Sequence, residues 1–367
     1  MRGVSLAGDT VPMNRLTALL LVILFSACSA APAAAPSPTA TATPTVAVAS
    51  LSPTATPTLA PTAPPTASPT LIPLPNTAQI DAPSGSVVWV IVGEQTATAR
   101  LFRSTDRGDS WQERPAPPKL PVVVSFIDDH EGWALVPQGG GVPPPAGGAC
   151  TAPSVALQHT GDAGATWQDL TPTGLNAGPC KGSLRFADAQ RGFIGAYDPN
   201  GSPLVYRTTD GGRNWSASQR LPDPPGFTTR SGGGTTLGIS RVATFGTTLL
   251  VTAFPTNPAT GTLFTYRSTD GGASWTYAST APNQYQDLAF VTAARWVQIS
   301  SPGDSKETTD GGATWHPFAT TYSQAAPIAP SVVFGDAQVG YATVRGAIQR
   351  TIDGGAQWTQ IRTPGTF

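Results

Sequence analysis

The sequence predicts an all-β fold, a six-bladed propeller of four-stranded antiparallel blades, from three observations. An eight-residue motif, Ser/Thr-x-Asp-x-Gly-x-x-Trp, occurs six times. A looser pattern lies between the copies, in which an apolar strand ends in Phe and is followed by a polar turn and an aromatic residue. Glycine (39 residues) and proline (38) are abundant, which is typical of short strands joined by many turns.

The repeated motif sets the number of blades. Its copies read STDRGDSW (104–111), TGDAGATW (160–167), TTDGGRNW (208–215), STDGGASW (268–275), TTDGGATW (308–315) and TIDGGAQW (351–358). Successive aspartates are 56, 48, 60, 40 and 43 residues apart, which is about the length of one blade. Even the longest intervals are too short to hide a seventh blade.

Each residue type in the motif has a physical reason for its place in a tight turn between two antiparallel strands. The Asp carboxylate accepts hydrogen bonds from N–H groups of its own turn, and the Ser or Thr hydroxyl adds a further local bond. The Gly takes a positive φ, and the Trp buries a large ring. We expect structural roles for Asp106, Asp162, Asp210, Asp270, Asp310, Asp353, Trp111, Trp167, Trp215, Trp275, Trp315 and Trp358.

The looser pattern supplies the other two strands of each blade. It reads SFIDDHEGWALV (125–136), LRFADAQRGFIGA (184–196) and VVFGDAQVGYATV (332–344), with a degenerate copy at 288–300. We place the propeller at 81–367. Two possibilities remain for the first strand of the first blade: residues 77–82 supply it, or the tail 359–367 completes that blade and closes the ring.

These patterns resemble the BNR/Asp-box repeat family from about residue 85 to the end, and we call the motif the Asp box from here on. The phrase F-x-D-x-x-x-G-W followed by T-x-D-G-G-x-x-W is most similar to the photosystem II stability/assembly factor-like propellers. The resemblance to sialidases is more distant. What the closer resemblance implies is a propeller that serves as an exported binding or assembly scaffold, without naming its partner.

The N-terminus predicts export. Residues 16–25 form an apolar run preceded by Arg15, too short for a bilayer span but suited to a secretory signal. The following Phe-Ser-Ala-Cys resembles a bacterial lipobox, which implies acylation of Cys28 and a signal peptide at 1–28. The alternative is an ordinary cleaved signal in which Cys28 has no role. Met1 and Met13 are both possible starts.

Residues 29–80 predict a disordered stalk. Ala, Pro, Thr and Ser dominate this segment, and it has no charged residue, so it cannot bury a core. A Pro-rich chain rises about 3.1 Å per residue, so the stalk could hold a domain roughly 100 Å from a membrane. We therefore expect a cell-surface protein anchored in the membrane through Cys28. Whether the stalk is O-glycosylated stays open.

Cys150 and Cys180 form an even pair in an oxidising compartment, which predicts a disulfide between them. The alternative is two free buried thiols. In the predicted strand order both residues lie on one side of the second blade, because Cys150 falls in its B–C loop and Cys180 in the link that leaves it.

Strand order also predicts which face binds a ligand. If the strands of a blade are called A to D in chain order, the A–B turns and the Asp boxes share one face. The B–C loops and D–A links lie on the opposite face, called the loop face here, and longer loops are where function concentrates. Ligand contacts are predicted at Arg114, Arg220, Arg230, Tyr285 and Tyr322, with ordinary surface residues as the alternative.

Composition limits the chemistry. With a net charge of −1 and 12% charged residues, the chain has no basic patch for nucleic acid. The three histidines show no metal-ligand spacing, and the polar run Asp128–Glu131 is better explained as a solvated turn. We expect neither a metal nor a cofactor, and a monomer.

Two functions are compared. The first is a non-enzymatic scaffold that binds a protein or glycan through the loop face. The second is a sialidase-like glycoside hydrolase, which the resemblance implies would need three convergent arginines and a Glu–Tyr pair. The Arg-Ile-Pro signature of sialidases is missing, and of the four glutamates (94, 113, 131 and 307) only Glu94 falls on the loop face. The sequence therefore favours the scaffold.

Overall fold

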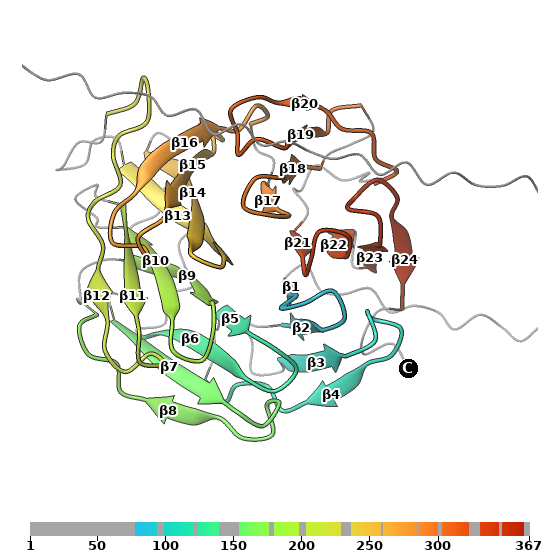
Figure 1. Ribbon diagram of the computed structural model, residues 1–367. Helices are drawn as coiled ribbons and strands as arrows, with labels where there is room; N and C mark the ends of the chain where they lie inside the picture. The colour runs from blue at the N-terminus through green and yellow to red at the C-terminus, as the bar shows by residue number, and fades with distance from the viewer. Residues whose placement is uncertain are drawn as a thin grey trace, which may run out of the picture. The chain divides into compact units, whose positions relative to one another are not determined.

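The computed structural model describes residues 78–93, 99–119, 123–138, 154–175, 180–197, 203–228, 236–257, 260–284, 287–299, 303–322, 331–344 and 347–362. These residues form six four-stranded sheets, and every sheet runs through four strands that are consecutive in the chain. Figure 1 shows the sheets arranged around one axis, as the blades of a propeller. The predicted signal peptide, Cys28, Glu94, Cys150, Arg230 and Tyr285 lie outside the described residues.

The first three blades contain β1 to β12. Blade one consists of β1 (Ala78–Asp81), β2 (Val88–Val92), β3 (Arg100–Ser104) and β4 (Gln112–Arg114). Blade two consists of β5 (Val123–Phe126), β6 (Gly132–Gln138), β7 (Ser154–Thr160) and β8 (Gln168–Leu170). Blade three consists of β9 (Cys180–Phe186), β10 (Gly192–Tyr197), β11 (Pro203–Thr208) and β12 (Ser216–Ala217).

The last three blades contain β13 to β24. Blade four consists of β13 (Thr236–Phe245), β14 (Thr248–Asn257), β15 (Phe264–Ser268) and β16 (Thr276–Thr280). Blade five consists of β17 (Ala289–Phe290), β18 (Trp296–Gln298), β19 (Lys306–Thr308) and β20 (His316–Pro317). Blade six consists of β21 (Val332–Phe334), β22 (Gly340–Val344), β23 (Ala347–Thr351) and β24 (Thr359–Ile361).

The predicted six blades of four antiparallel strands are confirmed, and the open question about the first blade is resolved. Strand β1 pairs with β2 along its full length, so the first of the two predicted possibilities, a strand within residues 77–82, is confirmed. The alternative, completion by the C-terminal tail, is wrong because β24 pairs with β23 of blade six. The boundary at residue 81 is also too late, because β1 begins at Ala78. No helix in the described part of the chain has the length and apolarity of a membrane span.

Each A–B turn lies beside the Asp box of the same blade, as the strand order predicts. In blade two, the N–H of Ala163 donates to the carbonyl of His130 at 2.8 Å. In blade six, the N–H of Gly354 makes the same bond to Gln338, again at 2.8 Å. These bonds tie the two turns of a blade together on one face, here called the Asp-box face.

Aromatic rings pack the blades against one another. Trp89 of β2 stacks on Phe126 at the end of β5, with ring centroids 3.9 Å apart, and Trp133 of β6 stacks on Phe186 in the same way at 3.8 Å. These rings are almost completely buried, and each buried aromatic side chain contributes about 1.5–3 kcal/mol to stability. The core is therefore a series of layers between neighbouring blades.

The ring closes through the same kind of contact. Ile80 and Phe102 of blade one share an apolar cluster with Tyr341 and Ile361 of blade six. The indole N–H of Trp111 donates to the carbonyl of Arg362 at 2.9 Å. The described strands thus close the ring by side-chain packing between two complete blades, not by a strand shared between the chain ends.

Candidate functional site

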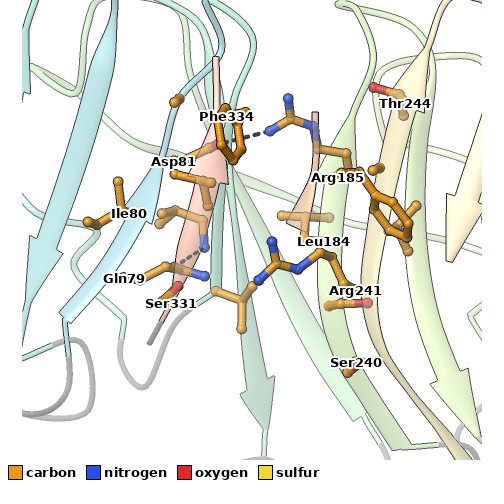
Figure 2. Close-up of a pocket in the computed structure, with 18 of the residues that line it drawn as sticks. Gln79, Ile80, Asp81, Leu184, Arg185, Ser240, Arg241, Thr244, Ser331 and Phe334 are labelled. Carbon is orange, nitrogen blue, oxygen red and sulfur yellow. Dashed lines mark hydrogen bonds and ion pairs between the residues drawn. The ribbon is translucent and has the colours of Figure 1, made fainter. Parts of the chain in front are cut away.

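A channel runs along the propeller axis and is the site with the richest chemistry in the described residues. Its cavity has a volume of about 260 Å³ and is lined by residues of the A strands of all six blades, β1, β5, β9, β13, β17 and β21, or next to those strands. Figure 2 shows its polar groups at two levels: Asp81 and Arg185 lie toward the ends of β1 and β9, and Arg241 lies at the level of Gln79 and Ser331, near the starts of β1 and β21. Because A strands run from the D–A links to the A–B turns, the first level faces the Asp boxes and the second faces the loops.

Polar side chains lie in these inner strands because an A strand pairs with a neighbour on only one edge. The N–H groups on its other edge need partners when they are buried. The Oε1 atom of Gln79 accepts from the N–H of Val124 at 3.0 Å, and the Oδ2 atom of Asp81 accepts from the N–H of Phe126 at 2.6 Å. Each bond joins the inner strand of blade one to that of blade two.

The level nearest the Asp boxes is an ion pair. A guanidinium nitrogen of Arg185, on β9, donates to Oδ1 of Asp81 at 2.6 Å. The Asp81 side chain is 11% exposed and that of Arg185 is 25% exposed. With the bond to Phe126, both carboxylate oxygens of Asp81 already have a donor, whereas the guanidinium makes this one hydrogen bond among the described residues.

The level nearest the loops is a second ion pair. Arg241 of β13 binds the carboxylate of Asp287 and also donates to the carbonyl of Val332 at 2.8 Å. Burial raises the pKa of the Asp287 carboxyl, while the Arg241 guanidinium and a hydrogen bond from the N–H of Leu288 oppose this shift. Arg241 and Asp287 thereby connect blades four, five and six across the channel.

The charges of the channel therefore balance. Asp81, Arg185 and Arg241 line the cavity, and Asp287 lies behind the wall in an ion pair with Arg241. Each carboxylate is engaged by a guanidinium and by a backbone N–H group. Groups with unused hydrogen-bonding capacity include the rest of the Arg185 guanidinium, the NH2 of Gln79, whose oxygen is occupied, and the Ser183 hydroxyl, which is buried on the wall without a partner. This arrangement suits the binding of a polar ligand by hydrogen bonds.

Among the predicted ligand contacts, Arg114 lies on the wrong face. Its Nε donates to the carbonyl of Ala163 at 2.7 Å and its Nη2 to that of Asp162 at 3.2 Å. Both acceptors belong to the Asp box of blade two, so Arg114 joins blades one and two on the Asp-box face. Arg220 is 46% exposed, follows blade three and pairs with Asp223 at 2.8 Å.

Tyr322 is a core residue, which corrects its prediction as a surface contact. Its side chain is fully buried, its hydroxyl donates to the carbonyl of Thr343 at 3.2 Å, and its ring packs edge-on against Trp358. A ligand on the loop face cannot reach it. The apolar partners that bury it are distant in the chain, which is why its neighbours in the sequence give no hint of this.

The Asp-box carboxylates are occupied by their own turns. Oδ1 of Asp210 accepts from the hydroxyl of Thr208 and from the N–H of Asn214, and Oδ2 accepts from the amide of Asn214. These bonds lower the pKa of Asp210 to about 2, and equivalent bonds from Thr166 lower the pKa of Asp162 to about 2. Such saturated carboxylates are poor candidates for proton transfer.

The described glutamates each bind a basic partner outside the channel. Glu113 pairs with Arg100 at 2.7 Å, Glu131 with His159 at 3.1 Å and Glu307 with Arg295 at 3.1 Å. Among the described residues that line the channel there is neither a glutamate nor a tyrosine. In the A–B turn of blade two, Asp128, Asp129 and His130 come close enough to hold a cation, but Oδ1 of Asp128 already accepts two N–H groups of its turn.

Sequence reasoning missed the channel residues. Their signal is a charged side chain inside or beside a short apolar A strand, as with Arg185 directly before Phe186 and Asp287 two residues before β17. Read one strand at a time, such residues resemble surface positions. Only an alignment of the repeats would have shown that these residues lie on, or directly beside, the strands nearest the axis.

No protein-family model and no curated protein matches the chain. Solved structures similar to it include YCF48 from Cyanidioschyzon merolae, with 17% identity and a TM-score of 0.47 over 81% of this chain and 89% of that one. A structure of YCF48 bound to D1 peptide has 17% identity and a TM-score of 0.42, over 77% and 95%. An Aleuria aurantia lectin in complex with Fucα1-6GlcNAc has 12% identity and a TM-score of 0.49, over 80% and 99%. At these values the likenesses carry no conclusion about function, and the identification of the chain as a six-bladed β-propeller rests on its own strand order and register.

Proposed function

We propose that this chain is a ligand-binding propeller held outside the cell by a lipid on Cys28 and a stalk over residues 29–77, and that it binds without catalysis. The observation that carries the proposal is the channel. Its ionic groups neutralise one another and connect the blades, while Arg185 and Gln79 keep hydrogen-bond donors directed at the cavity. Such a rigid, polar cavity is suited to recognition.

The sequence supports the location. The apolar run at 16–25, the Cys that follows it and the uncharged Pro-rich segment are together typical of a lipoprotein with a spacer. A spacer of that length would carry the propeller clear of the membrane. The loop face, with its longer connections and the Arg241 level of the channel, is the face we propose for the ligand.

The alternative is a sialidase-like glycoside hydrolase. Hydrolysis of this kind needs an acid and a nucleophile or base flanking the scissile bond. The described carboxylates are unsuited to either role, because the Asp-box aspartates are saturated by their turns and both channel aspartates are bound to arginine. Two paired arginines also differ from the three convergent ones of a sialidase-like site.

Turnover of fluorogenic glycosides by the purified full chain tests the proposal. The panel includes a sialoside and xyloglucan fragments. We expect no turnover from a folded, monodisperse sample. Turnover that survives purification and is lost in Arg185→Gln or Glu94→Gln, but not in Arg350→Gln on the Asp-box face, would establish the enzyme instead.

A further inference from the structure

We propose that the axial channel is a binding site for the end of a neutral carbohydrate, a single sugar ring or the terminal ring of a glycan. The inference deepens the proposed function, on which it rests, by choosing the ligand class. It follows from the size of the cavity, the mixture of donors and acceptors on its wall, its balance of charge and its phenyl rings.

Size sets the first limit. Sites for drug-sized ligands span about 300–1,000 Å³, and the channel is slightly smaller, at about 260 Å³. It can take one ring, or the tip of a longer chain, but not a folded segment. A ligand that enters only by its end leaves the rest of its length outside the channel.

The wall offers donors and acceptors together. The N–H groups of Val124 and Phe126 point at the channel edge of β5, because they bind Gln79 and Asp81 of the neighbouring blade. In an antiparallel strand the carbonyl of a residue points the same way as its N–H, so the carbonyl of Val124, which lines the channel, faces this edge as well. Beside them are the unused N–H groups of Arg185 and Gln79. A sugar hydroxyl both donates and accepts, and so matches a wall of this composition.

Charge balance disfavours an anion. A cleft attracts a charged ligand when its wall carries mainly the opposite sign. Here Asp81 and Asp287 offset Arg185 and Arg241. A bound carboxylate would place a third negative group beside two existing ones, whereas a neutral hydroxyl meets no such cost. The balance of charge therefore favours a neutral sugar over an acidic one.

Apolar surface completes the site. Phe245, Phe290 and Phe334 line the channel together with Asp81 and Arg185. A sugar ring has C–H faces as well as hydroxyls, so it can contact a phenyl ring while its hydroxyls reach the donors. An extended peptide end would gain less, because its terminal carboxylate meets the balanced charge described above.

Titration calorimetry with the full chain tests the proposal. The probes are methyl glycosides of glucose, galactose, mannose, xylose, arabinose and fucose. Uronic acids of the same rings and a short peptide mixture are the competing classes. We expect at least one neutral sugar to bind, and its uronic acid to bind at least about tenfold more weakly. Arg185→Gln should weaken the neutral sugar about tenfold or more, since hydrogen bonds from a charged donor are the strong ones.

Arg350→Gln is the matched control. Arg350 is also a half-buried arginine that joins two blades, but its partners, the carbonyl of Arg107 and the carboxylate of Asp109, lie on the Asp-box face. It should leave sugar affinity unchanged. Because Arg185→Gln leaves Asp81 without its ion pair, Thr244→Trp provides a second variant, which fills the channel from its wall without removing a charge. It should abolish binding while the melting temperature is retained.

The outcomes are distinct. The inference is overturned if none of the neutral sugars binds, if a uronic acid or a peptide binds more tightly than every neutral sugar, or if folded Thr244→Trp binds as the unmodified chain does. Peptide binding alone would leave the proposed function standing and remove the sugar. Hydrolysis of a glycoside would instead refute the proposal that the protein binds without catalysis, whether or not the channel binds a sugar.

Discussion

At the scale of single residues, the close approach of glycines to phenyl rings decides how tightly blades pack. A Cβ atom built on Gly192 would lie 2.5 Å from the ring of Phe186, far inside van der Waals contact, and Gly132 and Gly340 meet Phe126 and Phe334 in the same way. Each glycine opens a B strand opposite the Phe that ends the A strand. The glycine is there to make room for the ring.

We predict that Gly192→Ala lowers the free energy of unfolding by about 1–3 kcal/mol, because the methyl group displaces a packed aromatic ring. Gly161→Ala is the control, since its Cβ would meet nothing closer than 3.8 Å and its effect should stay within about 0.5 kcal/mol. Urea denaturation measures both. Equal effects would mean that the phenyl ring moves aside freely.

A second residue-scale prediction concerns acid. The pKa of Asp210 falls from its ordinary 3.8 to about 2 because Asn214 and its turn bind the ionised form. Below pH 3.8 the unfolded chain holds a proton on this group that the folded chain does not. The stabilisation is therefore complete above about pH 5 and is lost as the pH falls toward 2. We expect Asp210→Asn to be less stable at neutral pH and to approach the unmodified protein near pH 2. If the stabilities of the Asp210→Asn variant and the unmodified protein differed by the same amount at every pH, this explanation would be wrong.

The Asp boxes and the ligand contacts differ in how much their residues could be predicted. The chemistry of Asp210 was readable because its partners, Thr208 and Asn214, lie within four residues of it. Arg114 and Tyr322 were misplaced because the acceptors that hold them, Ala163 and Thr343, belong to other segments. A short sequence motif predicts hydrogen bonds within its own turn, but it does not predict bonds to residues that are distant in the chain.

At the scale of elements, the exposed edge of the A strand explains the polar residues around the axis. Ser125 in β5 is completely buried, and its hydroxyl accepts from the N–H of Phe186 in β9 at 3.0 Å. In blade one, Gln79 and Asp81 accept hydrogen bonds from N–H groups of β5 in the same way. The carboxylate of Asp81 thus satisfies a backbone N–H at the free edge of β5, and Arg185 in turn pairs with that carboxylate.

We predict that Ser125→Ala destabilises the protein by about 1–3 kcal/mol, because it leaves a buried N–H without an acceptor. The amide of Phe186 should exchange faster with deuterium, while amides of β23 on the far side of the ring keep their rates. Ser216→Ala, at an exposed position of β12, is the control and should have little effect. Unchanged exchange at Phe186 would show that this bond contributes nothing.

The predicted disulfide belongs to the same scale. β9 begins at Cys180, next to the link that enters blade three from the loop face, and Cys150 lies outside the described residues. If the bond forms, alkylation under denaturing conditions should label these two thiols only after reduction. Reduction should lower the free energy of unfolding by about 3–4 kcal/mol for a loop of this length. Labelling without reductant would establish free thiols.

At the scale of the whole molecule, six repeats were enough to predict the number of blades and the faces, because the period of the Asp box is the period of the fold. Closure was not predictable in this way. Closure depends on the apolar cluster in which Phe102 and Trp111 of blade one pack with Tyr341 and Ile361 of blade six. The repeated motif does not indicate which end of the chain completes which blade. All four strands of blade one come from one continuous segment. Closure of the ring therefore depends on the packing between blade one and blade six.

That interface should be a weak point that can be measured. Trp111→Phe removes the bond to the carbonyl of Arg362, and Arg350→Gln removes those to Arg107 and Asp109. Each should lower the free energy of unfolding by about 1 kcal/mol and raise amide exchange mainly in blades one and six. Arg100→Gln, which breaks an exposed ion pair with Glu113 on blade one, should change stability by less than about 0.5 kcal/mol. If the ring opens at this interface, the two effects will be coupled in the double variant, because the second loss acts on blades that have already separated. Additive effects with exchange spread over all six blades would mean that the blades separate together and that no interface is the first to open.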